Sequence, residues 1–156
     1  MKKGNLRLFI VVSCILLLPF SAMAADNIKI GSLVSTTGDL AAYGHPINNG
    51  GLLAEKDINA AGGVLGRNIK IILRDTQTNP MAGVDAAKKL VDIDKVVGIA
   101  GALSSGVTIP VATSVSIPSK VVQISPASTS EKITTLNDDD YLYRTVAMDA
   151  LQAPAL

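Results

Sequence analysis

Hydroxyl-bearing side chains are concentrated in three short segments that carry almost no charge. The segments are 35–43, 101–106 and 125–130, and Asp39 is the single charged residue among them. Such segments offer hydroxyls and backbone N–H groups, which suit the recognition of an anion. Acid–base catalysis and metal binding need titratable side chains instead. We therefore expect a binding site for a small anionic group rather than a reaction centre.

Ser105 is the first candidate for this site. Ser105 and Gly106 fall where a helix is predicted to begin, and the free N–H groups and positive dipole end of a helix favour a negative charge. We expect Ser128 and Thr129 to approach the same anion from the neighbouring loop, and Tyr43 to be exposed in the first segment. The alternative is that these serines and threonines only cap helices and form turns, which is their commonest use.

An exported hydrolase with Ser105 or Ser128 as its nucleophile is the enzymatic alternative. His45 is the only histidine, and no carboxylate pairs with it in a recognisable triad. The glycine-rich segment 62–67 follows a predicted helix rather than a strand, which is the wrong context for a dinucleotide. We therefore expect no enzymatic activity, no cofactor and no metal site.

The first 24 residues have the layout of a secretory signal peptide. Basic residues precede the apolar run 8–20, and Ala22-Met23-Ala24 follows as a small-residue cleavage site. The apolar run is shorter than the roughly 20 residues that a transmembrane helix needs. We expect cleavage after Ala24 and release into the periplasm, and lipid attachment at Cys14 is the alternative.

The segment 25–156 has the composition of one small domain. The signal holds three of the 14 basic residues and none of the 13 acidic ones, so the mature chain is slightly acidic. No basic cluster interleaved with aromatic residues remains, which argues against nucleic acid as a partner. The only cysteine is removed with the signal, which excludes disulfides and cysteine-ligated metals.

Strands alternate with helices along the mature chain. This alternation predicts an α/β fold with a parallel sheet and helices on both faces. In such a sheet, ligands bind at the carboxyl ends of the strands, where the three hydroxyl-rich segments are expected. Short apolar runs predict strands at 27–32, 68–73, 95–99, 121–124 and 141–145, and helical patterns are predicted from 44 to about 61, from Pro80, and at 107–114.

The first helix has an apolar stripe that is expected to face the sheet. The stripe consists of Ile47, Gly51, Ala54 and Ile58, which recur at helical spacing. With this stripe buried, Asn48 and Glu55 are expected to face away from the core. The helix should end at Gly62, because glycine readily adopts the left-handed conformation of a C-cap.

Several segments together resemble a known family. Their order and spacing are similar to those of the periplasmic leucine/isoleucine/valine-binding proteins of ABC transporters. The resemblance implies a two-lobed type I binding protein whose lobes close over a ligand. It also implies a partner, a membrane permease that receives a branched-chain or similar small amino acid. The segments are STTGDLAAYG, LLAEKDINAAGGVLGR, DTQTNP, GALSSG, SPASTS and YLYRTVAMDALQ.

The resemblance also implies roles for individual residues. Ser105 and Thr129 match residues that hold the ligand α-carboxylate, together with the backbone of the residue that matches Ala127. Tyr43 matches a tyrosine that contacts the ligand from the first loop. Asp149 aligns near the crossover between lobes and is expected to approach the cleft.

The chain differs from this family in length. Members are more than twice as long, so we expect residues 25–156 to form the N-terminal lobe without the second lobe. The second lobe supplies most of the ammonium and side-chain contacts, and we therefore expect weak or no binding by this chain alone. We also expect uncovered apolar surface. A sensory ligand-binding domain of the same fold is the alternative to a transport component.

Overall fold

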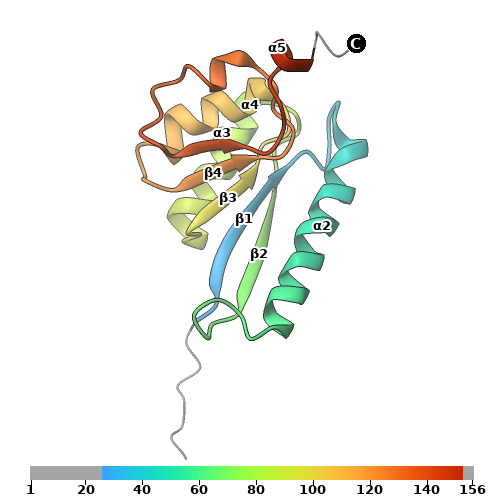
Figure 1. Cartoon of the computed structure of the whole chain (residues 1–156), viewed down its shortest axis with the longest axis vertical. Coiled ribbons are helices and arrows are strands. Elements are labelled where there is room, and N and C mark those ends of the chain that lie inside the picture. Colours follow the sequence, from blue (N-terminus) through green and yellow to red (C-terminus); the bar gives the residue numbers. More distant parts are fainter. Residues whose placement is uncertain (1–25, 153–156) are drawn as a thin grey trace, which may run out of the picture.

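The computed structural model describes residues 26–152 as one five-stranded sheet with helices on both faces (Figure 1). The strand order is β2-β1-β3-β4-β5, and every neighbouring pair is parallel. The predicted α/β fold is confirmed. The predicted signal peptide, residues 1–24, lies outside the described residues. The strands are β1 (Ile28–Val34), β2 (Ile69–Asp75), β3 (Gly98–Gly101), β4 (Val122–Ser125) and β5 (Leu142–Arg144).

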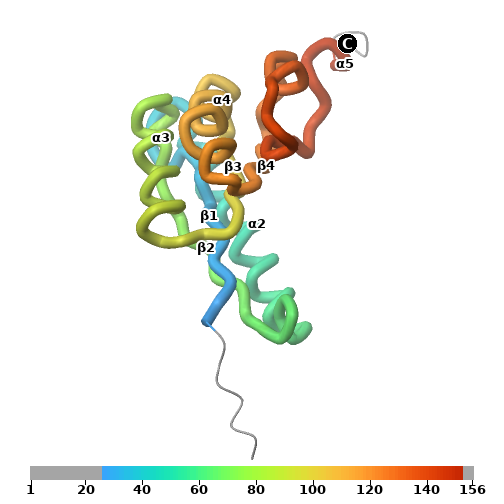
Figure 2. Tube along the Cα trace, turned by 90° about the vertical axis from the view of Figure 1, so that its left-hand side faces the viewer, coloured from blue at the N-terminus to red at the C-terminus, as the bar shows by residue number. Residues whose placement is uncertain are grey.

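The helices divide between the two faces of the sheet. Figure 2 shows α3 and α4 on one side and α2 on the other. Both α3 and α4 continue directly into π-helical segments. The helical elements are α2 (Ala41–Ala60), α3 (Pro80–Lys88), the π-helical η1 (Lys89–Asp94), α4 (Ser105–Val111), the π-helical η2 (Ala112–Ser116), the 3₁₀ turn η3 (Glu131–Ile133) and α5 (Asp149–Gln152).

The main apolar core lies between the sheet and the α3–α4 layer. Inward-facing Leu33 of β1 and Ile99 of β3 are at most 3% exposed, as are Leu90, Val107 and Val111 of the helical layer. Burial of a side chain of this kind stabilises the fold by roughly 1.5–3 kcal/mol. This core therefore fixes the end of the sheet from which the candidate loops emerge.

β3 begins at Gly98, three residues later than the predicted start at Lys95. Lys95 has a positive φ of 58° and ends η1 as its left-handed cap. The two valines that follow connect the helix to the sheet. The N–H of Val96 donates to the backbone carbonyl of Leu90 at 3.1 Å, and the N–H of Val97 donates to the backbone carbonyl of Lys29 at 2.9 Å. The strand prediction was early because the run of valines begins before the chain has entered the sheet.

The prediction for the buried face of α2 was wrong. Asn48, expected to point away from the core, is only 7% exposed, whereas Ile58 of the predicted stripe is 38% exposed. The side chain of Asn48 accepts a hydrogen bond from the Ser32 hydroxyl of β1 at 2.8 Å. The face of α2 toward the sheet is therefore held in large part by polar contacts.

Two further side chains of α2 form hydrogen bonds with the outer edge of β2. This strand pairs only with β1, so its outward N–H and C=O groups lack strand partners. Asn59 accepts from the N–H of Ile69 at 2.7 Å and donates to its carbonyl at 2.9 Å. Glu55 accepts from the N–H of Ile71 at 2.6 Å. The helix thus protects a sheet edge, which periodicity alone does not reveal.

The opposite half of the same sheet face has no helix over it within residues 26–152. Val122 and Ile124 of β4 and Tyr143 of β5 are 36%, 41% and 46% exposed, and all three point to the α2 side of the sheet. Val122 and Ile124 line an apolar surface hollow together with Ile30 and Ala100.

Candidate ligand-binding site

The loops after β3 and β4 meet at the carboxyl edge of the sheet. The hydroxyl oxygen of Ser105, at the start of α4, accepts a hydrogen bond from the backbone N–H of Ser130 at 3.3 Å. The carbonyl of Ser130 in turn accepts from Arg144 Nη1 at 2.8 Å. The segments that follow β3 and β4 are therefore joined to the end of β5 at one edge of the sheet, as the topology predicts.

Thr129 and Asp149 also come together at this edge. The backbone N–H of Asp149 donates to the carbonyl of Thr129 at 3.0 Å. Asp149 is the first residue of α5, which lies at the same end of the molecule as the carboxyl end of β1 (Figure 1). Thr129 is half-buried, and both Asp149 and the neighbouring loop residue Ala127 are exposed. The structure thus gathers Ser105, Ala127, Thr129 and Asp149.

Ser128 belongs to the same loop but faces inward. It is 1% exposed, and its hydroxyl lies 2.8 Å from the hydroxyl of Thr108 in α4. It also donates to the carbonyl of Leu103 at 3.3 Å. Ser128 therefore ties the loop after β4 to the loop after β3 from beneath.

Ser125 completes this tie at the end of β4. Its fully buried hydroxyl donates to the carbonyl of Ala102 at 2.6 Å and accepts from the N–H of Ser128 at 3.0 Å. A second, longer bond of 3.4 Å comes from the N–H of Ala127. One hydroxyl thus links the two site loops through backbone groups on both of them.

Gln123 of β4 supports the loops one layer deeper. Its side chain is fully buried, its Nε2 donates to the carbonyl of Gly101 at 3.1 Å, and its Oε1 accepts from the Ser116 hydroxyl at 2.7 Å. Sequence reasoning did not single out this residue. The available signal was a glutamine between apolar residues in the short predicted strand 121–124, which is consistent with an inward polar side chain.

Gly101 allows the loop after β3 to pass close to β1. Its φ is +140°, a region that side chains rarely adopt, and a Cβ at this position would collide with the carbonyl of Leu33. Glycine is therefore required where the chain leaves the sheet toward Ser105.

Tyr43 is placed differently from the prediction. It lies in the first turn of α2, which begins at Ala41, and not in a loop. Its side chain is 63% exposed. The predicted exposure is therefore confirmed, and within residues 26–152 no hydrogen bond joins Tyr43 to Ser105 or Thr129.

The pKa of Asp75, at the end of β2, is shifted by its surroundings. Burial alone would raise the pKa of Asp75, but the hydroxyl of Thr37 and the backbone N–H groups of Gln77, Thr36 and Thr37 donate to its carboxylate. Together these donors lower the pKa below its ordinary value. Aspartate commonly forms a turn by accepting from the N–H two residues on, and Asp75 followed by the polar segment 76–79 is the signal for such a turn in the sequence.

The residues that could hold a metal or pair with a serine do not come together within the described part of the chain. No three His, Cys, Asp or Glu side chains of residues 26–152 gather closely enough to hold a metal ion. His45 lies exposed on α2 and makes no hydrogen bond to Ser105 or Ser128 in this part of the chain. No helix in this region is long and apolar enough to cross a membrane.

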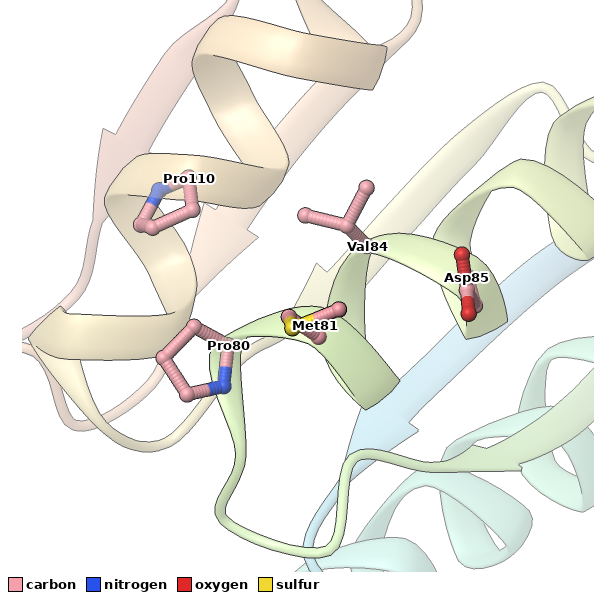
Figure 3. Close-up of a pocket in the computed structure, with 5 residues that line it drawn as sticks. All are labelled: Pro80, Met81, Val84, Asp85 and Pro110. Atoms are coloured by element: carbon pink, nitrogen blue, oxygen red, sulfur yellow. The ribbon is translucent and has the colours of Figure 1, made fainter.

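A surface pocket lies elsewhere, between α3 and α4. It is lined by Pro80, Met81, Val84 and Asp85 of α3 and by Pro110 of α4, and Figure 3 shows Asp85 at the end of this group away from Pro110. Its volume is about 230 Å³. This is below the roughly 300 Å³ at which small-molecule sites usually begin. None of the candidate residues lines it.

Comparison with known proteins places the chain in a family. The model of the family described as "Periplasmic binding protein" matches residues 27–156. The chain belongs to this family. The leucine-, isoleucine-, valine-, threonine- and alanine-binding protein of Pseudomonas aeruginosa is 35% identical over 156 positions, which cover 99% of this chain and 41% of that protein. The resemblance stated from the sequence is confirmed.

Solved structures of this periplasmic binding protein family share the fold. The branched-chain amino acid transporter substrate-binding protein LivJ of Streptococcus pneumoniae, in complex with isoleucine, has a TM-score of 0.75 and 32% identity and matches 80% of this chain and 35% of its own. A solute-binding protein of an ABC transporter from Rhodopseudomonas palustris, in complex with 3,4-dihydroxybenzoic acid, has a TM-score of 0.70 and 30% identity, over 79% and 32% of the two chains.

These relatives are binding proteins by name, and they are much longer than this chain. It spans 41% of the length of the Pseudomonas protein and about a third of the two solved structures. The aligned region therefore corresponds to one part of a larger binding protein.

Proposed function

We propose that residues 25–156 form the N-terminal lobe of a non-enzymatic periplasmic substrate-binding protein. In this role the lobe takes part in capturing a branched-chain or similar small amino acid, which is then delivered to an ABC permease. The observation that carries the proposal is the family match together with the hydroxyl-rich edge at which Ser105 and the 126–130 loop are joined. A cleaved signal at 1–24 would place the protein in the periplasm.

We assign the ligand carboxylate to Ser105, Thr129 and the backbone of Ala127. The oxygen of Ser105 accepts from Ser130, and its own proton is not donated to any described residue. The hydroxyl of Thr129 makes no hydrogen bond within residues 26–152. Both hydroxyls can therefore donate to an anion, and such a bond contributes about 1.5–3 kcal/mol. Ser128, which is buried, supports these groups from below.

Tyr43 and Asp149 have outer roles in the proposal. Tyr43 contacts the ligand from the first turn of α2, where its side chain is largely exposed. Asp149 lies beside Thr129 at the start of α5 and borders the cleft. Neither is assigned to the carboxylate itself.

The ligands of the structural relatives support a carboxylate-reading role for this lobe. Isoleucine and 3,4-dihydroxybenzoic acid differ in shape and in the ammonium group, but both carry a carboxylate. The hydroxyls and N–H groups of this half of the site suit the carboxylate that the two ligands share. Selection among their remaining parts then depends on contacts from the second lobe.

Titration of the 15N-labelled chain from residue 25 with isoleucine, followed by two-dimensional NMR, tests this function. We expect weak binding with a dissociation constant of about 1 mM or more, since half a site supplies few contacts. The amide signals of 104–106 and 127–130 should shift together. Ser105→Ala should weaken the response, while Ser114→Ala, an exposed serine on η2, should not. Shifts confined to residues outside 104–106 and 127–130, or an equal response of Ser105→Ala and Ser114→Ala, would contradict the proposal.

A further inference from the structure

A single carboxylate fastens the loop that leads into α2. Asp75 Oδ1 accepts hydrogen bonds from the backbone N–H of Thr36 at 2.8 Å, of Gln77 at 2.9 Å and of Thr37 at 3.3 Å. Its Oδ2 accepts from the hydroxyl of Thr37 at 2.6 Å. We refer to residues 35–40 as the first loop and to residues 75–79 as the anchor segment. Four bonds therefore converge on one side chain between them.

The contact continues along both segments. The hydroxyls of Ser35 and Thr76 lie 2.8 Å apart in a buried position. Thr78 Oγ1 accepts from the N–H of Leu40 at 3.0 Å, immediately before α2 begins. Gly38 has a φ of +80°, and a Cβ there would collide with the backbone carbonyl of Gln77. The first loop is thus seated on the anchor segment along its whole length.

We propose that Asp75 is a positioning residue of the ligand site: its ionised carboxylate holds the first loop, and through it the first turn of α2, so that Tyr43 is presented to the ligand. The inference rests on the proposed function, because it takes Tyr43 as a ligand contact. Asp75 itself does not touch the ligand.

The four donors favour a carboxylate at this position. An asparagine could keep its oxygen toward the three N–H groups, but its N–H₂ would face the Thr37 hydroxyl, which would have to change from donor to acceptor, and the negative charge would be lost. The same donors lower the pKa of Asp75 despite partial burial. Other charged groups are close: Arg74, Asp85 and Lys89 line the same surface hollow, and Asp39 lies in the first loop.

Hydrogen exchange tests the hold on the loop without any ligand. In Asp75→Asn we expect the amides of Thr36, Thr37 and Gln77 to exchange about tenfold faster or more, since they lose a charged acceptor. The amides of Ser128 and Ser130 should keep their rates. Thr37→Val, at an exposed position, removes only one of the four donors and keeps the carboxylate. We expect it to raise the exchange rates less, and only within the first loop.

The ligand readout separates positioning from general stability. On titration with isoleucine, the Tyr43 amide should shift in the wild type and lose that response in Asp75→Asn, while Ser105 and Thr129 still respond. In the wild type the Tyr43 response should disappear only as the pH falls through the pKa of Asp75, which lies below the ordinary value of about 3.9. Asp85→Asn and Asp39→Asn should retain both the response and its pH dependence.

The outcomes distinguish this inference from the proposed function. Unchanged exchange in Asp75→Asn, or equal loss of response at Tyr43 and Ser105, would overturn the positioning role. A pH dependence that disappears in Asp85→Asn or Asp39→Asn would also overturn it. A response to isoleucine confined to amides outside 104–106 and 127–130 would instead count against the proposed function, with the exchange rates still deciding whether Asp75 holds the loop.

Discussion

Two pairs of loops at the carboxyl edge of the sheet are held by different chemistry. The loops after β3 and β4 are joined from below by neutral, fully buried groups, chiefly Gln123, Ser125 and Ser128. The first loop and the anchor segment are joined by the partly exposed carboxylate of Asp75. A neutral network keeps its bonds at any pH, whereas a carboxylate keeps them only while it is ionised. The structure thus combines a fixed pair of loops with one whose hold depends on a charge.

Removing the deepest polar group of the neutral pair should have the largest effect. Gln123→Leu keeps the side-chain volume but leaves the Ser116 hydroxyl and the Gly101 carbonyl without their partner. We expect a loss of about 3 kcal/mol in the free energy of unfolding, measured by urea denaturation. Ile124→Ala, on the same strand but 41% exposed, should cost about 1 kcal/mol or less. Equal losses in the two variants would argue against a supporting role for Gln123.

Ser128→Ala should have the next largest effect and should separate support from binding. The variant loses bonds to Thr108 and Leu103, and we expect a stability loss of about 1.5 kcal/mol. Ser105 is half-buried, and its hydroxyl is hydrogen-bonded only to Ser130 among the described residues. Ser105→Ala should therefore lose less stability than Ser128→Ala but more of the isoleucine response. A larger stability loss in Ser105→Ala, together with a larger loss of isoleucine response in Ser128→Ala, would contradict these roles.

Asp75→Asn should have the smallest effect on stability, and only this one should depend on pH. We expect a loss of about 1 kcal/mol at pH 7, since the carboxylate is partly exposed to solvent. The pKa of Asp75 is lowered in the folded chain, so its stabilisation is complete above the ordinary value of about 3.9 and is lost as the pH falls through the lowered one.

The pH series gives a direct contrast between the two loop pairs. The difference in unfolding free energy between wild type and Asp75→Asn should shrink as the pH falls below about 4. The difference for Gln123→Leu should stay constant over the same range, because none of its bonds involves a titrating group. A gap for Asp75→Asn that remains unchanged at low pH would contradict the account.

The fold could be predicted further than the contacts that hold it. Apolar runs placed all five strands and the parallel sheet, because buried strands have a distinctive composition. The orientation of α2 was mispredicted, because Asn48 bonds to a hydroxyl of β1 and both Glu55 and Asn59 bond to the outer edge of β2. These partners are known only once the sheet order is known. Polarity at these positions is as consistent with solvent exposure as with such bonds.

The candidate site divides in the same way. Its loops followed from the rule that places ligands at the strand ends, and Ser105, Ser128 and Thr129 from their positions in those loops. Ala127 and Asp149 followed only from the family resemblance. The inward orientation of Ser128 and the helical position of Tyr43 depend on local backbone geometry, which sequence spacing does not specify. The support from Gln123 and Asp75 depends on partners more than twenty residues away along the chain.

The most direct test of the central claim compares isoleucine with its amide. The two molecules share the side chain and the ammonium group, but isoleucinamide has no carboxylate. If this lobe reads the carboxylate, isoleucine should shift the amide signals of Ser105, Ala127 and Thr129 in the labelled chain, and isoleucinamide should leave them in place at the same concentrations. Equal shifts with both compounds, or shifts confined to other parts of the chain, would contradict the account.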